Sequence, residues 1–184
     1  MTFHFQPIPV DVVLPCCTAA LPAARRLDRT DLEMASGVAW EFKSFDALTK
    51  AELYALLQLR SEVFVVEQAC AFQDLDGSDD RAMHLLGQQG DALVAYARCF
   101  AAGVKFAEAS IGRVVAHSRA RGTGIGHGLM REAIERLQQH WGNQPIRIGA
   151  QARLKNFYTQ HGFIDIGARY VEDGIDHLEM LRPA

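Results

Sequence analysis

A run of alternate glycines is the most unusual chemistry-bearing feature of the chain. The segment RARGTGIGHGLM (119–130) carries glycine at 122, 124, 126 and 128, between a strand-like and a helix-like stretch. Glycine costs about 0.5–1 kcal/mol relative to alanine within an element, so it is expected where the backbone must approach a ligand or another segment closely. A helix N-terminus presents unpaired N–H groups and partial positive charge. The segment therefore predicts a site for an anion such as a diphosphate, with a flexible loop as the alternative.

The spacing of these glycines excludes two common phosphate-binding motifs. In Gly-x-Gly-x-x-Gly the third glycine would fall on His127 or Leu129, and the Gly-Lys-Ser/Thr of a P-loop is missing. The pattern that fits is Arg121-x-x-Gly124-x-Gly126.

This pattern resembles the pyrophosphate loop of the GNAT superfamily of N-acetyltransferases, which follows the fourth strand and begins the third helix. A second motif of that superfamily, Tyr-x-x-x-Gly-Phe, is matched by NFYTQHGF at 156–163. Over about residues 38–182 the chain is similar to the ElaA-type branch, on the segments LYALLQLRSEVFVVEQ, DLDG, IGRVV, GAQARLKNFY and EDGIDH. Residues 38–184 are therefore expected to form an N-acetyltransferase domain.

Hydrophobic periodicity and turn residues place the elements that must position these motifs. Thr49 and Glu52 have the spacing of a capping box, and Glu132 lies four residues before Arg136 on a second helical stretch. The apolar faces of the two helices are Leu53, Leu56, Leu57, Val63 and Phe64, and then Leu129, Ala133, Ile134 and Leu137. In chain order we expect a strand at 38–45, a helix at 49–68, two strands within 84–100 around Gly90-Asp91, a strand at 111–117, a helix from Gly126 to about His140, a strand at 146–151, a short helix within 156–163, and a hairpin of 165–172 with 175–181.

The resemblance implies an α/β fold with a mixed, twisted sheet of six or seven strands. The sheet would be splayed between strands four and five, with helices on both faces and coenzyme A in the splay. The helix between these two strands is long enough for a parallel crossover.

Residues 1–37 differ in composition from the rest of the chain. Four of the six prolines fall there, at 7, 9, 15 and 22, and the next is Pro145. A secretory signal is not expected, because Lys and Arg are missing before Arg25 and Asp11 interrupts the segment. Met34 stands just before the first expected strand, so a leader produced by a misplaced start and a docked arm are equally good explanations. We expect removal of all residues before Met34 to leave the fold and cofactor binding intact.

Composition argues against several classes of partner. The chain has 184 residues, is 49% hydrophobic and 22% charged, and has a net charge of -3. These values predict one soluble domain and give no electrostatic reason to expect nucleic acid or membrane binding. The four cysteines have neither metal-ligand nor disulfide-scaffold spacing, and 18 consecutive apolar residues occur nowhere. We expect a cytoplasmic protein, without a metal, whose partner is a small molecule or a peptide; a homodimer is left open.

The resemblance assigns a cofactor site for acetyl-coenzyme A, which would serve as co-substrate. Backbone N–H groups of strand four would bind the thioester and the pantetheine arm, and the glycine segment would bind the diphosphate. Gln151 stands where many relatives have an Asn that contacts pantetheine, and a Gln has a different reach. The cofactor-binding residues implied are Val114, Val115, Ala116, Arg121, Gly122, Thr123, Gly124, Ile125, Gly126, His127, Gln151 and Tyr158.

Transfer of an acetyl group to an amine needs proton handling on both sides of the reaction. Tyr158 matches the superfamily tyrosine that protonates the departing thiolate as general acid; the alternative is a core tyrosine. Strand four carries no Asp or Glu, where some relatives have the base. Candidates for that role are Glu67, His84 and His177, of which His177 is preferred, with a structural histidine as the alternative at each histidine position.

The acidic stretch DLDGSDD (74–80) is the last candidate feature. In the superfamily this part of the chain usually forms a wall of the acceptor site, so its carboxylates would attract a cationic amine. The residue types favour the alternative interpretation, a solvated turn. An EF-hand does not fit, because the glycine comes too early and the closing Glu is missing.

Together these features predict an N-acetyltransferase that acetylates a primary amine of a small molecule or peptide by direct attack in a ternary complex. An acyl-enzyme is not expected, since neither Cys70 nor Cys99 has the sequence signature of a catalytic dyad. Two alternatives are a noncatalytic acyl-coenzyme A sensor and an acyltransferase like the acyl-homoserine lactone synthases.

Overall fold

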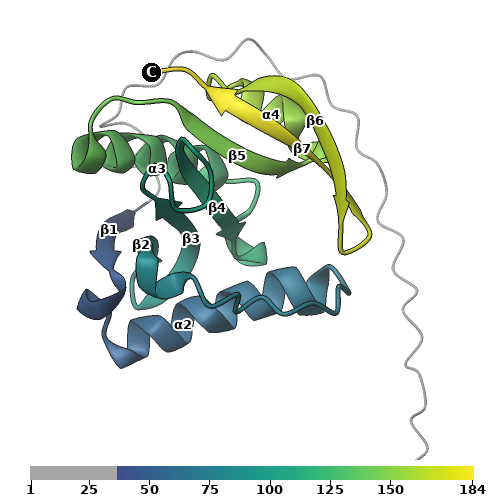
Figure 1. Cartoon of the computed structure of the whole chain (residues 1–184). Coiled ribbons are helices and arrows are strands. Elements are labelled where there is room, and N and C mark those ends of the chain that lie inside the picture. Colours follow the sequence, from purple (N-terminus) through teal and green to yellow (C-terminus); the bar gives the residue numbers. More distant parts are fainter. Residues whose placement is uncertain (1–36) are drawn as a thin grey trace, which may run out of the picture.

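The fold is built around a seven-stranded mixed sheet, with helices on both of its faces (Figure 1). The computed structural model describes residues 37–184, so the expected leader lies outside the described residues except for Gly37. The strand order is β1-β2-β3-β4-β5-β7-β6. The strands are β1 (Val38–Ser44), β2 (Met83–Gln89), β3 (Ala92–Phe100), β4 (Ala109–Ala116), β5 (Ile146–Gln151), β6 (Ile164–Glu172) and β7 (Ile175–Arg182); the main helices are α2 (Lys50–Arg60), α3 (Ile125–Trp141) and α4 (Lys155–Thr159).

The first helix begins as its sequence predicts but changes character halfway. Thr49 and Glu52 form the expected capping box, in which the Thr49 N–H donates to Glu52 Oε2 at 2.8 Å. Regular α-helix ends at Arg60, and the chain continues as a π-helix, η2 (Ser61–Glu67). The bond from the Cys70 N–H to the Val65 carbonyl, 3.1 Å long, spans five residues. Single π-helical turns are rare and are found frequently at functional sites.

The core is divided between the two faces of the sheet. Along β3, Ala95 and Ala97 belong to the cluster that buries α3, whereas Tyr96 between them belongs to the cluster that buries α2. Side chains alternate across a strand, so this division shows that the two helices cover opposite faces. The predicted apolar face of α3 is buried in full: Leu129, Ala133, Ile134 and Leu137.

Strands β4 and β5 are parallel neighbours that separate almost at once. They pair only at Ala109 with Ile146 and at Ser110 with Arg147. Farther along, the register between β3 and β4 shifts by one residue, and Arg113 takes a φ of 47°. Such a bulge bends its strand, and it bends β4 at the point where β5 leaves it. The expected mixed sheet, splayed between strands four and five, is confirmed (Figure 1).

Candidate active site

The glycine segment lies where β4 ends and α3 begins, beside the splay. Gly122 and Gly124 have φ values of 80° and 88°, and Gly124 is the N-cap of α3. A Cβ built on either glycine meets no heavy atom within 4 Å. Side chains do not favour this backbone conformation, and the space in front of it is open. The loop therefore offers the bare backbone and the free volume that a diphosphate on a helix N-terminus needs.

The next two glycines lie in α3 beside other elements. A Cβ on Gly126 would lie 3.7 Å from the Phe157 ring, and one on Gly128 would lie 3.5 Å from Trp40, which are ordinary van der Waals distances. Of the four alternate glycines, Gly122 and Gly124 are therefore the two whose backbone conformation favours glycine.

Arg121 is already engaged by the protein. Its Nε donates to the carbonyl oxygen of Ala116 at 3.0 Å, and its Nη2 donates to Oε2 of Glu67 at 2.8 Å. Nη1 donates to the other oxygen of Glu67, so the ion pair is bidentate. The pair raises the pKa of Arg121 and lowers that of Glu67. Both carboxylate oxygens of Glu67, a predicted base candidate, therefore accept from Arg121 while this pair is closed, and the lowered pKa makes Glu67 a weaker base.

The remaining loop residues are placed around the start of α3. Thr123 Oγ1 donates to the Ala120 carbonyl at 2.7 Å, and Ile125 is buried in the core. His127 Nδ1 lies 3.0 Å from Nε2 of His161, and burial lowers the pKa of His161 to about 4. Burial therefore favours the uncharged form of His161 beside the loop.

Tyr158 lies in α4 with its ring in the core. It is 7% exposed and packs edge-on against Phe157 and Phe163. Burial raises its pKa to about 12, so the hydroxyl stays protonated at neutral pH. That hydroxyl has no hydrogen-bond partner among residues 37–184. The side chain has the protonation state of a general acid.

The two histidines among the base candidates, His84 and His177, lie in different environments. His84 is fully buried in β2, where Nδ1 lies 2.8 Å from the Tyr96 hydroxyl and Nε2 lies 3.0 Å from the Asp79 carbonyl. Burial lowers the pKa of His84. Both of its nitrogens have partners, so this ring has no lone pair left for an acceptor amine.

His177 lies on β7 directly opposite Gln151 of β5, and cross-strand partners share one face of a sheet. Its Nδ1 is 2.8 Å from the Ile175 carbonyl, which can only accept, so Nδ1 carries the proton and Nε2 keeps a lone pair in the neutral ring. The ring stacks on Tyr170, with centroids 5.3 Å apart. A Cβ on Gly149 would clash with the Tyr170 hydroxyl, so a side chain there would require the Tyr170 ring to shift.

A segment of which the sequence analysis named only Glu67 and Cys70 links the two sides of the splay. We call residues 67–70 the crossing segment. Gln151 Nε2 donates to Gln68 Oε1 at 3.1 Å, and Cys70 Sγ lies 3.5 Å from the carbonyl oxygen of Asp173 at the β6–β7 turn. These partners are 83 and 103 residues away along the chain, and no local pattern predicts such contacts.

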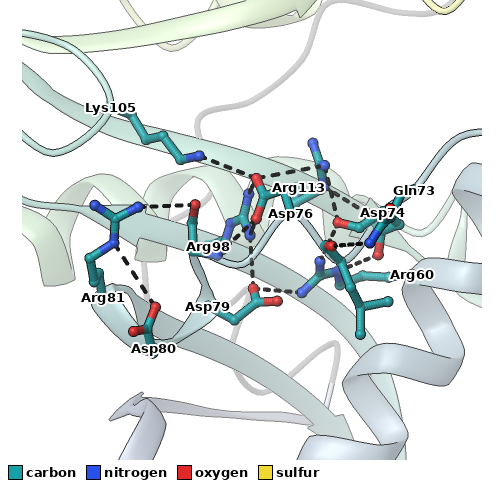
Figure 2. Close-up of polar contacts among 12 residues, drawn as sticks. Arg60, Gln73, Asp74, Asp76, Asp79, Asp80, Arg81, Arg98, Lys105 and Arg113 are labelled. Atoms are coloured by element: carbon teal, nitrogen blue, oxygen red, sulfur yellow. Dashed lines mark hydrogen bonds and ion pairs between the residues drawn. The ribbon is translucent and has the colours of Figure 1, made fainter.

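The expectation of a solvated turn at the acidic stretch is wrong for Asp74, which is buried, and for Asp79, which is half-buried, whereas Asp76 is exposed but ion-paired (Figure 2). Asp74 is buried and pairs with Arg60 at 2.8 Å, while Asp76 pairs with Arg98 at 2.7 Å. Asp79 pairs with both arginines, at 2.8 Å each. Their charges are neutralised by buried guanidinium groups, which the residue types alone did not reveal. They are also not free to attract a cationic amine.

One arginine of this network connects the acidic loop to the bulge in β4. Arg113 Nε lies 2.7 Å from Asp74 Oδ1, and the guanidinium lies over the Phe72 ring. The loop therefore holds the residue whose backbone has the uncommon φ. Beyond it, Val114 to Ala116 form the end of β4, where β5 no longer pairs with the strand.

Other chemistries find little support among the described residues. Cys99 is fully buried and its pKa is raised to about 12 by burial, which leaves it a thiol. Within residues 37–184, no three His, Cys, Asp or Glu side chains are grouped so as to hold a metal ion. No helix in the same range is both long enough and apolar enough to cross a membrane.

Comparison with known proteins identifies the class that this fold and site define. The family described as acetyltransferase (GNAT) domain matches residues 49–182, and the chain belongs to it. The protein ElaA of Escherichia coli strain K12 is 44% identical over 147 residues, which cover 79% of this chain and 96% of that protein.

Solved structures agree with this assignment. The crystal structure of Escherichia coli ElaA has a TM-score of 0.73 and 43% identity, covering 79% of this chain and 99% of the other. An acyl-CoA N-acyltransferase from Pseudomonas aeruginosa has a TM-score of 0.74 and 42% identity, covering 78% and 99%. The predicted membership of the GNAT superfamily, and of its ElaA-like branch, is confirmed.

Proposed function

We propose that the protein transfers the acetyl group of acetyl-coenzyme A to a primary amine of a small molecule or peptide, by direct attack in a ternary complex. The observation that carries the proposal is the glycine loop: two residues with positive φ, open space in front of them, and a helix N-terminus behind. The name of the Pseudomonas aeruginosa relative, an acyl-CoA N-acyltransferase, supports the same class of reaction.

The residues fit coenzyme A at both ends of the splay. The backbone from Gly122 to His127 would hold the diphosphate, with Arg121 beside it. The end of β4, Val114 to Ala116, would contact the thioester and the pantetheine arm, because β5 leaves those N–H groups without a strand partner on that side. Gln151 would contact the arm from β5.

The chain also supplies the two proton-handling groups that the reaction needs. As the amine nitrogen bonds to the carbonyl carbon and the carbon–sulfur bond breaks, the amine gives up one proton and the thiolate gains one. His177 would accept the first through Nε2, directly or through water. Tyr158 would donate the second, and its raised pKa keeps that proton in place until the thiolate forms.

The proposal is tested by supplying acetyl-coenzyme A with a panel of polyamines, amino acids, aminoglycosides and peptides, and measuring the free thiol released. With an acceptor in hand, Tyr158→Phe should lower kcat by about 10²- to 10⁴-fold while cofactor affinity holds, because only the hydroxyl is lost. Tyr54→Phe is the matched control, since Tyr54 is exposed on α2.

Three outcomes would contradict parts of this scheme. Turnover of Tyr158→Phe at the parent rate would make the tyrosine structural. A transfer-competent acetyl group trapped on Cys70 would replace direct attack by an acyl-enzyme. Tight acetyl-coenzyme A binding with no acceptor in the whole panel would favour a sensor over an enzyme.

A further inference from the structure

The crossing segment contacts two of the residues proposed to hold the cofactor. Glu67 binds Arg121 of the glycine loop, and Gln68 binds Gln151 of β5. A cofactor that occupied the splay would need the same groups. The free protein therefore keeps part of its cofactor site engaged with its own side chains.

The contact between Glu67 and Arg121 has the geometry that a phosphate would use. Three N–H groups of the guanidinium are engaged, two by the carboxylate and one by the Ala116 carbonyl. The planar fork of an arginine suits a carboxylate and a phosphate equally. A diphosphate on Gly122 to His127 would also place negative charge near the Glu67 carboxylate, and like charges repel.

The pair is built so that it can be exchanged. The two side chains are 41% and 43% exposed, and solvent-exposed ion pairs are weak. Beside them Ala69 has a φ of 50°, which non-glycine residues adopt rarely, and η2 before it is π-helical. The crossing segment is held in an uncommon backbone conformation by a few side-chain contacts.

We propose that Glu67 is a positioning residue that occupies Arg121 in the free protein and yields it to the diphosphate of coenzyme A. Loss of this pair releases one end of the crossing segment from the glycine loop. This inference rests on the proposed function, because it requires the diphosphate to bind the glycine loop.

Substitution Glu67→Gln tests the exchange directly. It keeps the size of the side chain and one acceptor oxygen but removes the competing charge. Calorimetric titration at low salt should show coenzyme A and acetyl-coenzyme A binding about 2- to 5-fold more tightly than to the parent. The gain should shrink at high salt, because surface charge interactions are screened. Equal or weaker binding by the variant would overturn the inference.

Glu62→Gln is the matched control. Glu62 lies in the same helical segment, is similarly exposed, and faces His117 at 3.4 Å rather than Arg121. It removes the same charge but not the pair, so its effect on affinity should be smaller. In an Arg121→Ala background the gain in coenzyme A affinity from Glu67→Gln should vanish. A gain that persists there would mean that Glu67 acts by long-range electrostatic repulsion and not through Arg121, which would contradict the proposal.

The movement of the crossing segment is followed by hydrogen exchange on the full chain. Acetyl-coenzyme A should speed the exchange of amides at 67–70 in the parent protein, although it slows exchange around the glycine loop. Slower exchange at 67–70 would show that the cofactor tightens this segment, and the proposal would be wrong. A parent protein that binds neither coenzyme A nor acetyl-coenzyme A would refute the proposed function, whereas binding without the Glu67→Gln gain refutes this inference alone.

Discussion

Two loops flank the bent strand β4: the acidic loop, residues 74–81, which contains the acidic stretch, and the glycine loop, residues 121–127, which contains the open glycines. They differ in how much of their polar surface is already paired. Three carboxylates of the acidic loop are matched with three arginines and a lysine, in contacts of 2.7–3.2 Å. The glycine loop has one exposed ion pair and open space in front of its backbone. The loop with the high charge density has three of its four carboxylates in close ion pairs, whereas the loop with the missing side chains is open.

The difference shows which features indicate binding. The carboxylates of Asp74, Asp76 and Asp79 are each paired with cations of the same domain, so they are not available to a ligand. Backbone N–H groups of the first turn of a helix have no partner within the helix, so an open helix N-terminus can bind an anion without any charged side chain. The acidic loop instead supports Arg113 at the β-bulge, and through it the end of β4.

Removing Arg60 should have the largest effect, and it tests whether the acidic loop is structural. The Arg60 side chain is fully buried, so Arg60→Ala leaves Asp74 and Asp79 each short of a partner and should lower the free energy of unfolding by about 3–5 kcal/mol. Chemical denaturation measures this. Arg81→Ala, which removes a side chain 56% exposed, is the control and should cost under about 0.5 kcal/mol. Similar losses for both variants would contradict a buried network.

Filling the glycine loop should have the next largest effect, and on binding rather than on folding alone. Gly124→Val places methyl groups in the space for the diphosphate and should weaken acetyl-coenzyme A by about 30- to 100-fold, the loss of one or two charge-assisted hydrogen bonds. Gly142→Val is the matched control, because Gly142 has a φ of 83° and open space at the other end of α3. Both variants should lose stability, but only the first should lose affinity by calorimetry.

The pH dependence of stability should separate the two loops further. Ion pairing with Arg98 and Lys105 holds the pKa of Asp76 well below its usual value, so its contribution is present above the unfolded pKa of about 3.9 and is lost as pH falls through the folded pKa. Asp76→Asn should therefore destabilise by about 1–2 kcal/mol at pH 7, and the difference from the parent should shrink below about pH 4. Asp80→Asn, at an exposed position, should show no such difference at any pH in urea titrations.

Truncating the arginine of the glycine loop should have the smallest effect. Arg121→Ala removes one partly solvated charge and also frees Glu67, so acetyl-coenzyme A affinity should fall by no more than about 5-fold. Backbone donors from Gly122 onward remain in place. A fall as large as that of Gly124→Val would show that the side chain, and not the backbone, holds the anion.

Most of the fold follows from local sequence signals. The capping box at Thr49, the turn at Asp173-Gly174 and the apolar face of α3 each depend on residues within a few positions of one another, and each appears in the structure. The π-helical turn of η2 and the bulge at Arg113 were not predicted. The bulge is a property of the register of β4 against β3, which a single strand sequence does not contain, and the π-helical turn continues a helix whose apolar pattern does not distinguish the two helix types.

The candidate site was predictable for the same reason where it is built from backbone. The glycine loop is a contiguous stretch, and the places of its two open glycines follow from strand, loop and helix order. The contacts of the side chains were not predictable, because the partners are distant: Arg60 and Asp74 are 14 residues apart, and Glu67 and Arg121 are 54. For that reason the sequence could name Glu67 and His84 as bases but could not show that both are already engaged.

The two paired positions between β4 and β5 also bear on how this protein is kept intact. Within residues 37–184, strands β4 and β5 have no paired positions beyond Ser110 and Arg147. Under the proposed function, a coenzyme A molecule in that gap would contact both halves of the sheet and hold them together. At a hundred times its dissociation constant it would add about 2.7 kcal/mol to the free energy of unfolding. The lifetime of the folded protein would then rise and fall with the supply of the cofactor, so that abundance as well as rate would follow the acetyl donor.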